Sequence, residues 1–270
     1  MIVSENLCNQ VKDLVYQTAE FIRKELIGFT YDRVEKKGKN DLVSYVDKQA
    51  ERILVDGLLK LIPASGFITE EGTIQKVGEQ FNWIIDPLDG TTNFIHGLPV
   101  FSISVALQEW EDLVLGVVYE INRDEMFYSW KGGGVFMNKT PIKVSSNPLL
   151  NTSLLATGFP YTDFKKVDDY LSLLKILMQE SQGIRRMGSA AVDMAYVACG
   201  RFEGYFEFNI NSWDIAAGMF LVRQAGGQVT NFLGKSEIFM SRQMVSTNGL
   251  IHDSLLRLIL NYFSPSPGIE

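Results

Sequence analysis

The chain has 270 residues, 46% of them hydrophobic and 21% charged, which is typical of a folded globular protein rather than a disordered or fibrous one. Its formal net charge is −7, from 25 basic and 32 acidic residues, which argues against a basic surface that binds nucleic acid or membranes. So acidic a protein would need cations to help it hold an anionic ligand.

The chain contains two cysteines, Cys8 and Cys199, and two histidines, His96 and His252. We expect the thiols to be small buried groups, because two cysteines form neither a disulfide framework nor a zinc cluster. A metal here would use oxygen ligands, as Mg²⁺, Mn²⁺ and Ca²⁺ do. The N-terminus lacks a secretory signal pattern, and no run approaches the ~18 apolar residues of a membrane span. The sequence therefore predicts a reduced, cytoplasmic protein.

An amphipathic helix is predicted near the start of the chain, because apolar residues recur every three or four positions over residues 7–22. Segment 35–40 is polar and basic and contains a glycine, which is typical of a mobile loop. A second helix is predicted to follow residues 41–44 and to run to about Leu61, since Pro63 stops it.

From residue 66 onward, apolar and β-branched residues form short runs separated by turns that carry Gly, Asn or Asp. Five strands are predicted in succession with few helices between them, which favours a largely antiparallel sheet. They are residues 66–68, 81–85, 101–107, 113–119 and 126–130.

The second half alternates between strand and helix patterns, which implies layered sheets and helices of the α+β or α/β class. Strands are predicted at 153–156, 184–187, 204–208, 227–230 and 244–247, and helices at 167–179, 189–198, 213–224 and 251–262. The tail 264–270 has no apolar pattern and is predicted to be disordered.

The stretch 83-WIIDPLDGTTNF-94 carries the strongest chemical signal. A buried strand ends in Asp86, Pro87 prevents its regular continuation, and the turn brings Asp89 close to Asp86. Two neighbouring carboxylates repel each other unless a cation lies between them, and the Leu88 carbonyl offers a further oxygen ligand. The stretch is therefore a candidate metal site.

The residues that follow this pair suit an anion such as phosphate. Gly90 allows close approach of the backbone, and residues 91–93 are predicted to begin a helix, where free N–H groups favour an anion. The alternative interpretation is a capped turn, since Asp, Asn and Thr are common in turns and caps. A nucleophilic aspartate of the dehalogenase type is disfavoured, because that motif has one residue between its aspartates, whereas Asp86 and Asp89 are separated by two.

Three further segments carry acidic residues that are candidates to complete the site, although each alone has an ordinary explanation. Glu70 and Glu71 end a short strand, and only one is expected to face the site because adjacent side chains on an extended chain point apart. Asp214 opens a helix rich in Ala and Gly, where an Asp is usually a cap. Asp47 lies in a predicted helix, where an Asp is usually exposed.

The order of these segments resembles the inositol monophosphatase family. The resemblance rests on 41-DLVSYVDKQAE-51, 67-FITEEG-72, 83-WIIDPLDGTTNF-94, 188-GSAA-191 and 212-SWDIAAG-218, with a weaker likeness in 134-GVFMNKTPIKVS-145. It covers about residues 5–260 and implies a layered αβαβα sandwich. It also implies one catalytic unit over residues 1–263, with a metal and phosphate half at about 1–150 and a substrate half at about 151–263.

The resemblance implies a role for each matching residue. The metal ligands would be Glu70, Asp86, the Leu88 carbonyl, Asp89 and Asp214. The catalytic residues would be Glu70, which reaches a third ion through water, and the pair of Thr91 and Asp47, which helps to activate the attacking water. The substrate-binding residues would be Leu88, Asp89, Gly90, Thr91, Gly188, Ser189, Ala190, Glu207 and Asp214, with the Gly90 and Thr91 amides on the phosphate.

The implied activity is Mg²⁺-dependent hydrolysis of a small phosphorylated polyol or sugar, most directly myo-inositol monophosphate, by attack of a metal-activated water. Two to three Mg²⁺ ions are expected, with Mn²⁺ as a substitute and Li⁺ and Ca²⁺ as inhibitors. A homodimer is expected, with no membrane and no direct nucleic-acid binding.

Alternatives within the family are fructose 1,6-bisphosphate and 3′-phosphoadenosine 5′-phosphate as substrates. Relatives that act on the adenosine bisphosphate often have Lys-Glu where this chain has Thr92 and Asn93. A third alternative is a regulatory or partner-binding protein that keeps the fold.

Three further features bear on the site. Arg185 and Arg186 precede Gly188, so one of them could approach the pocket, although paired arginines at a strand end are more often surface ion-pair residues. Lys36 lies on the segment whose lysine approaches the site in relatives. Residues 208–211 fall where relatives vary, so substrate choice can shift there.

Overall fold

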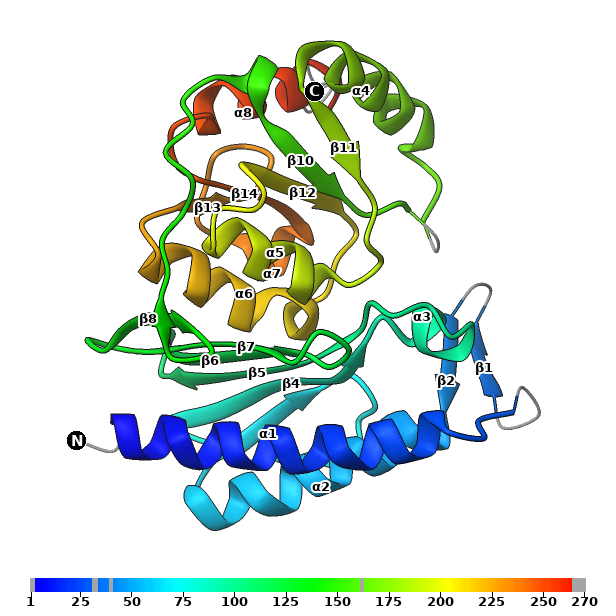
Figure 1. The fold of residues 1–270 in the computed structure, drawn as a ribbon, viewed down its shortest axis with the longest axis vertical. Helices are drawn as coiled ribbons and strands as arrows, with labels where there is room; N and C mark the ends of the chain where they lie inside the picture. The colour runs from blue at the N-terminus through cyan, green and yellow to red at the C-terminus, as the bar shows by residue number, and fades with distance from the viewer. Residues whose placement is uncertain (1–2, 31–33, 39–40, 161–162, 264–270) are drawn as a thin grey trace, which may run out of the picture.

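The structure is a computed structural model that describes residues 3–30, 34–38, 41–160 and 163–263, with the backbone alone for 34–38 and 41–43. Five layers stack along its long axis (Figure 1): helices α1 and α2, a seven-stranded sheet, helices α5 and α6, a five-stranded sheet, and helices α4 and α8. The predicted αβαβα sandwich is therefore confirmed. The tail 264–270 lies outside the described residues.

Helices α1 (Glu5–Leu26) and α2 (Tyr45–Leu61) form the first layer. Ser4 caps α1 by accepting a hydrogen bond from the Leu7 amide at 3.3 Å, and the predicted apolar stripe is the buried face of the helix. Both helices pack their apolar faces against the seven-stranded sheet in one core cluster. The two predicted N-terminal helices are confirmed.

The predicted loop at 35–40 is wrong for its first part. Strands β1 (Val34–Gly38) and β2 (Asp41–Ser44) pair as an antiparallel two-stranded sheet, with Lys36 opposite Leu42. The sequence did not reveal this hairpin, because a short strand with few apolar residues has no clear alternating pattern. Its stability depends on pairing with the neighbouring strand. Residues 39–40 and the Lys36 side chain lie outside the description, so the expected approach of that lysine stays a prediction.

The seven-stranded sheet follows chain order from β3 to β9, with β3 and β4 parallel and all later pairs antiparallel. Its strands are β3 (Gly66–Thr69), β4 (Phe81–Asp89), β5 (Ser102–Glu109), β6 (Asp112–Glu120), β7 (Glu125–Trp130), β8 (Gly134–Met137) and β9 (Thr140–Pro141). The five predicted strands and their largely antiparallel pairing are confirmed.

Strand β4 is irregular at Pro87, as predicted. Asp86 pairs with Ser104 and Asp89 with Ser102, so three steps along β4 oppose two along β5. This is a bulge, and Pro87 favours it because it has no N–H to donate to the ladder. The bulge lies directly at the two candidate carboxylates.

The second sheet has the order β11-β10-β12-β14-β13, with β11, β10 and β12 parallel and the remaining pairs antiparallel. Its strands are β10 (Leu154–Thr157), β11 (Gly183–Arg185), β12 (Gly204–Phe208), β13 (Gln228–Thr230) and β14 (Gln243–Thr247). Helices α4 (Val167–Glu180) and α8 (His252–Phe263) cover its outer face. The predicted alternation of the second half is confirmed element by element.

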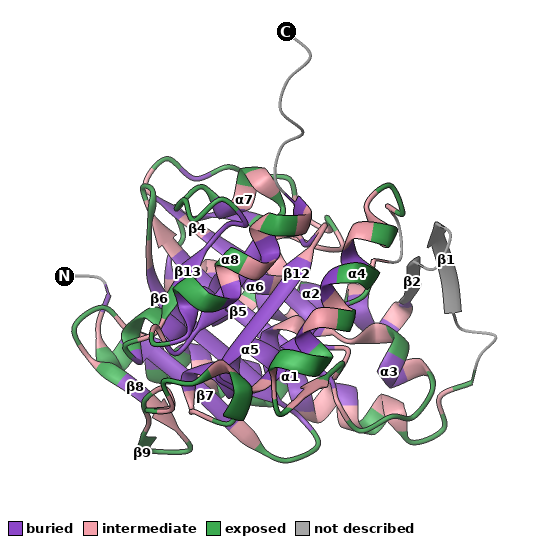
Figure 2. Ribbon diagram, turned by 90° about the horizontal axis from the view of Figure 1, so that it is seen from above, coloured by how far each residue is buried: buried purple, intermediate pink, exposed green. Residues whose placement is uncertain are grey.

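Helices α5 (Ala190–Ala198) and α6 (Ser212–Gln224) lie between the two sheets and are buried along most of their length (Figure 2). Small residues permit this close packing: a Cβ on Gly116 of β6 would lie 2.9 Å from the Ala217 carbonyl oxygen of α6. The two short helices α3 (Thr91–Ile95) and α7 (Ile238–Ser241), with the 3₁₀ turn η2 (Leu150–Thr152), complete the described elements.

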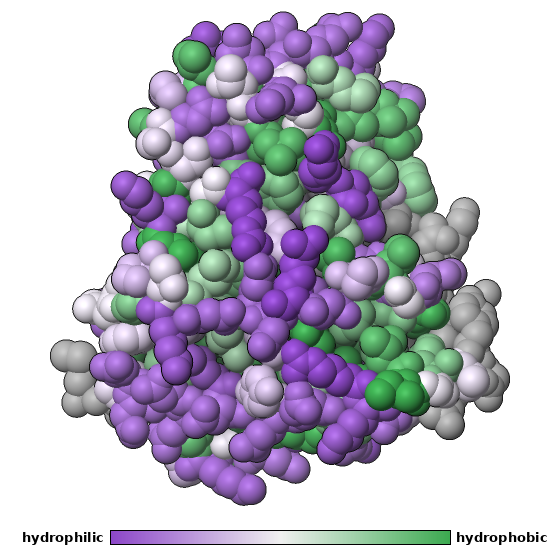
Figure 3. All heavy atoms as spheres, viewed as in Figure 1, coloured by the Kyte–Doolittle hydropathy of each residue, from purple (hydrophilic) through white to green (hydrophobic). Residues whose placement is uncertain are grey.

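The surface in Figure 3 is mostly hydrophilic, and hydrophobic side chains gather at its upper right over α4, where Leu171 and Met178 are exposed. Among the described helices, none has both the length and the apolar character needed to cross a membrane. Both thiols are free, with Cys8 buried and Cys199 half-buried.

Candidate functional site

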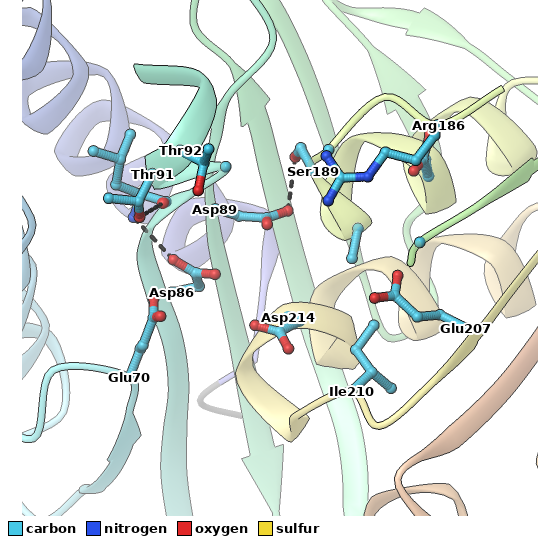
Figure 4. A pocket seen from close by; sticks show the side chains of 16 residues that line it. Glu70, Asp86, Asp89, Thr91, Thr92, Arg186, Ser189, Glu207, Ile210 and Asp214 are labelled. Atoms are coloured by element: carbon cyan, nitrogen blue, oxygen red, sulfur yellow. Dashed lines mark hydrogen bonds between the residues drawn. The ribbon is translucent and has the colours of Figure 1, made fainter. Parts of the chain in front are cut away.

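A cavity of about 280 Å³ collects the predicted site residues from both halves of the chain (Figure 4). Eleven of the twelve line it: Glu70, Asp86, Leu88, Asp89, Gly90, Thr91, Gly188, Ser189, Ala190, Glu207 and Asp214. The twelfth, Asp47, contacts the Thr91 side chain from α2. The segments that the sequence pointed to are therefore one site in space.

Gly90 turns the chain from the β4 bulge into α3. Its φ is 96°, in the left-handed region that favours glycine, and an added Cβ would lie 3.1 Å from both the Gly188 and the Val100 carbonyl oxygens. Helix α3 begins at Thr91, as the sequence predicted, and the first amides of a helix have no acceptor within it. Gly90 and Thr91 both line the cavity, so the first amides of α3 lie beside it.

Asp47 is fully buried and holds the Thr91 side chain. The Thr91 hydroxyl lies 2.9 Å from Asp47 Oδ1 and 3.0 Å from the Leu88 carbonyl oxygen, and Asp47 Oδ2 accepts from the Ser44 amide and hydroxyl at 2.9 and 2.6 Å. Burial raises the pKa of Asp47, against the effect of these donors. The expectation of an exposed Asp47 on its helix is wrong, because it forms the capping box of α2 with Ser44.

Asp86 lies on β4, and Glu70 directly follows the end of the neighbouring strand β3. Burial, followed by repulsion from Glu70, Asp89 and Asp214, raises the pKa of Asp86 well above its usual range. Asp86 Oδ1 also accepts a hydrogen bond from the Leu88 amide at 2.9 Å. Of the adjacent pair Glu70 and Glu71, only Glu70 lines the cavity, as predicted.

Asp89 faces the N-terminus of α5. Its Oδ2 accepts hydrogen bonds from the Ser189 hydroxyl and the Ala191 amide, each at 2.7 Å. Burial raises the pKa of Asp89 to about 6, while these two donors and the Arg186 charge act in the opposite direction. The bonds join the β4 bulge of the first half to α5 of the second.

Asp214 comes from the first turn of α6. Its Oδ2 accepts a hydrogen bond from the Asn211 amide at 2.8 Å, which is the cap that a helical N-terminus favours. Burial, followed by repulsion from Asp89, raises its pKa well above the usual range. Asp214 is therefore both a helix cap and part of the carboxyl group cluster, so the two interpretations of this residue are compatible.

The donor set fits a hard divalent cation. Four carboxyl groups and the Leu88 carbonyl would supply oxygen ligands to such an ion, and Figure 4 shows Glu70, Asp86, Asp89 and Asp214 directed toward one space. A bound cation would relieve the electrostatic repulsion among these four carboxyl groups. Among the described residues, no three His, Cys, Asp or Glu side chains meet the spacing of a preformed ion site.

The opposite wall carries Gly188, Ser189, Ala190 and Glu207. Burial raises the pKa of Glu207 to about 7, and Glu207 accepts a hydrogen bond from the Tyr205 hydroxyl. Gly158 leaves the room that this carboxyl occupies, because a Cβ there would lie 2.0 Å from it. The wall is polar but carries few cations, which suits the hydroxyl groups of an alcohol.

Five further residues line the cavity: Thr92, Gly158, Arg186, Asp193 and Ile210. Thr92 and Ile210 lie in segments that the sequence had singled out, at 91–93 and 208–211, whereas Gly158 and Asp193 were not predicted. Of the two arginines, Arg186 takes the alternative of approaching the pocket, because the turn after β11 brings it to the cavity beside Phe159, 5.8 Å from its ring. Asp193 is buried, and its Oδ1 has no hydrogen-bond partner among the described residues. Its spacing of four from Ser189 on α5 was the available signal, since both then share a helix face.

Comparison with known proteins agrees with this geometry. The model of the inositol monophosphatase family matches residues 4–264, so the chain belongs to that family of phosphatases. It is 40% identical to the inositol-1-monophosphatase of Mesorhizobium japonicum, over 84% of this chain and 86% of that protein. It is 42% identical to the fructose-1,6-bisphosphatase/inositol-1-monophosphatase of Thermotoga maritima, over 84% and 86%.

Two further comparisons bear on fold and function. The Nus factor SuhB of Escherichia coli is 40% identical, over 84% of this chain and 86% of that protein. The crystal structure of the extragenic suppressor protein suhB from Bartonella henselae matches with a TM-score of 0.88 and 38% identity, over 93% of this chain and 97% of that one. Relatives with similar folds thus carry both phosphatase and Nus factor names.

Proposed function

We propose that the protein hydrolyses a small phosphomonoester, most directly myo-inositol monophosphate, with Mg²⁺ held by Glu70, Asp86, Asp89, Asp214 and the Leu88 carbonyl. The observation that carries the proposal is the convergence of four carboxyl groups, with Asp86 fully buried among them, on one cavity beside the α3 turn. When bound, Mg²⁺ activates water and neutralises phosphoryl charge.

Residues at the start of α3 and on α2 would bind the phosphate and activate the attacking water. The Gly90 and Thr91 amides bind phosphoryl oxygens, because the bulge and Gly90 expose them at the start of α3. The Thr91 hydroxyl, held 2.9 Å from Asp47, orients the attacking water and passes its proton toward that carboxylate. Burial of Asp47 supports this role, because its raised pKa makes it a better base.

The second half orients the leaving alcohol. Ser189 and Ala190 begin α5 beside Asp89, and Glu207 approaches from β12 on the same wall. We assign the substrate hydroxyl groups to this wall. Because the cavity draws residues from both halves, residues 1–263 would act as one catalytic unit. The homodimer and the inhibition by Li⁺ and Ca²⁺ stay predictions.

The test is a kinetic panel with and without Li⁺. Purified protein with Mg²⁺ is offered inositol 1-phosphate, glycerol phosphate, fructose 1,6-bisphosphate, a nucleoside monophosphate and 3′-phosphoadenosine 5′-phosphate, and released phosphate is measured. We expect the highest kcat/KM for inositol 1-phosphate and inhibition by Li⁺. No phosphate release from any of them would refute the proposal.

Two substrates are alternatives within the same chemistry. The dual name of the Thermotoga maritima relative favours fructose 1,6-bisphosphate as the first of them. Thr92 and Asn93 stand where relatives that act on 3′-phosphoadenosine 5′-phosphate often have Lys-Glu, which argues against the second. A kcat/KM for fructose 1,6-bisphosphate above that for inositol 1-phosphate would reassign the substrate and leave the cation site unchanged.

A second candidate function is a regulatory role through partner binding, which the Nus factor name of the Escherichia coli relative favours. Asp86→Ala separates the two functions, because it removes a proposed cation ligand from the interior while the surface is kept. A partner captured equally by wild type and Asp86→Ala would support a role independent of turnover. Capture by neither protein would argue against it.

A further inference from the structure

Helix α2 carries two fully buried carboxyl groups one turn apart, Asp47 and Glu51. Asp47 holds Thr91 and already has a part in the proposed reaction. Glu51 touches neither the cavity nor Thr91. Its side chain instead accepts four hydrogen bonds from residues 69–73, the end of β3 and the segment after it that carries Glu70.

These four bonds enclose Glu70 in the sequence. Glu51 Oε1 accepts from the Thr69 hydroxyl at 2.9 Å and from the Thr73 amide and hydroxyl, each at 2.7 Å. Glu51 Oε2 accepts from the Glu71 amide at 2.8 Å. The residues immediately before and after Glu70 are therefore both tied to one carboxylate on α2.

The backbone of this segment is held by individual bonds to other parts of the chain rather than by regular secondary structure. Strand β3 ends at Thr69, β4 begins at Phe81, and the residues between them belong to no helix or strand. The Glu70 amide itself donates to the Ile85 carbonyl oxygen at 3.2 Å, which extends the β3–β4 ladder by one bond. Bonds from amides and hydroxyls to a buried carboxylate are stronger than neutral ones and hold their geometry well.

We propose that Glu51 is a positioning residue that fixes the backbone on both sides of Glu70 and so presents the Glu70 carboxylate to the cation site. Helix α2 then positions two parts of the site: Asp47 holds Thr91, and Glu51 holds the residues on either side of Glu70. This inference rests on the proposed function, since it assigns Glu70 to the cation.

The decisive variant is Glu51→Gln. The amide keeps the size of the side chain, but its NH₂ group must face a donor at either the Glu71 amide or the Thr73 groups, so at least one bond is lost and two donors oppose each other. We expect the Mg²⁺ dissociation constant from calorimetry to rise at least about tenfold, as for loss of a residue that orients a ligand. The substrate KM at saturating Mg²⁺ should change less than about twofold, because the alcohol wall is untouched.

Two further variants keep the test decisive if Glu51→Gln does not fold. Thr73→Val removes one hydroxyl donor at nearly constant volume and should weaken Mg²⁺ about threefold, a smaller loss than for the ligand-orienting carboxylate itself. Glu79→Gln is the matched control, because it removes the same charge from an exposed position of the same segment and should bind Mg²⁺ like wild type.

The outcomes separate this inference from the proposed function. Wild type that neither binds Mg²⁺ nor releases phosphate would overturn the proposed function. Wild-type Mg²⁺ affinity in folded Glu51→Gln and Thr73→Val, with active wild type, would overturn the positioning role alone. Glu51→Gln could also have a lower metal-free unfolding midpoint than wild type but show the same rise in midpoint when Mg²⁺ is added. That result would likewise mean that Glu51 stabilises the fold only.

Discussion

Asp89 is the carboxyl group that joins the two halves of the site. One of its oxygens accepts from Ser189 and Ala191, while the carboxyl group as a whole lies among three other acids. Its hydrogen bonds come from neutral donors, which an amide oxygen can also accept from, whereas its charge is what a cation requires. A substitution at Asp89 can therefore remove the negative charge while keeping the hydrogen-bond acceptor.

Asp89→Asn should remove most activity and leave the fold intact. The amide oxygen still accepts from Ser189, and loss of one negative charge lowers repulsion within the acid cluster, so the metal-free unfolding midpoint should equal or exceed that of wild type. We expect kcat/KM to fall roughly 10²–10³-fold, which corresponds to several kcal/mol of lost charge stabilisation. The measurements are phosphate release and thermal unfolding.

Asp168→Asn is the control for this change, because it removes one charge from an exposed position in the first turn of α4. It should leave both activity and unfolding unchanged. Turnover of Asp89→Asn near that of wild type would contradict the assignment of Asp89 to the cation.

Glu207 provides a pH-dependent contribution to stability. Its pKa is about 7 in the folded protein against a reference of 4.5, because burial disfavours the charged form. The unfolded chain therefore releases this proton at lower pH than the folded chain does. The stabilising contribution is complete below about pH 4.5 and is lost as the pH rises through about 7.

Glu207→Gln should reduce this pH dependence, because a neutral amide keeps the acceptor for the Tyr205 hydroxyl and has no charge to bury. Relative to wild type, metal-free Glu207→Gln should gain stability between pH 5 and pH 8, on the order of 2–3 kcal/mol for a shift of this size. Urea unfolding of both proteins at the two pH values measures the gain. An equal pH dependence in the two proteins would contradict a raised Glu207 pKa.

At the scale of elements, the packing of α6 on the seven-stranded sheet depends on glycine. A Cβ on Gly116 would lie 2.9 Å from the Ala217 carbonyl oxygen, which is backbone and cannot swing away. Gly116→Ala should therefore destabilise the protein by about 1–3 kcal/mol, as overpacking does in other cores. Urea unfolding checks this value.

Gly183→Ala is the matched control in the second sheet. It is the same substitution within a strand, but the nearest heavy atom to its new Cβ is an Arg185 side-chain nitrogen at 3.4 Å, an ordinary contact. It should change stability by less than about 1 kcal/mol. Equal losses from the two variants would contradict the packing explanation.

How much the sequence predicts depends on whether an element carries its own pattern. Helix α1 has a complete apolar stripe, and the β4 turn has two acids, a proline and a glycine, so both were predictable from local physics. The β1–β2 hairpin was not, because its polar strands are defined by pairing with each other. Asp193 was also missed as a cavity residue, and Arg186 could not be distinguished from Arg185, since tertiary packing alone directs a single polar side chain inward.

At the scale of the whole molecule, the site explains how an acidic protein can hold a phosphate. A net charge of −7 and a cluster of buried acids oppose anion binding, and Arg186 is the one cation among the residues that line the cavity. Divalent ions would reverse the local charge and relieve the repulsion at once. Because the proposed ligands come from β4 and α6, this binding energy would also couple the two halves of the chain.

Asp214→Asn tests this coupling. Mg²⁺ that binds only the folded state adds about 2.7 kcal/mol to the free energy of unfolding at one hundred times its dissociation constant. At the same Mg²⁺ concentration the variant should gain less than about 1 kcal/mol, although its amide oxygen can still accept the capping bond from Asn211. Denaturant unfolding with and without Mg²⁺ measures both gains.

Amide hydrogen exchange then shows whether Mg²⁺ stabilises both halves of the chain. In wild type, Mg²⁺ should slow exchange in both β4 and α6, because one ion would draw ligands from each. In Asp214→Asn both elements should lose this protection, including β4, which the substitution does not touch. Protection of β4 that persists in the variant would mean that the first half binds Mg²⁺ independently, and the halves would then be separate units rather than one.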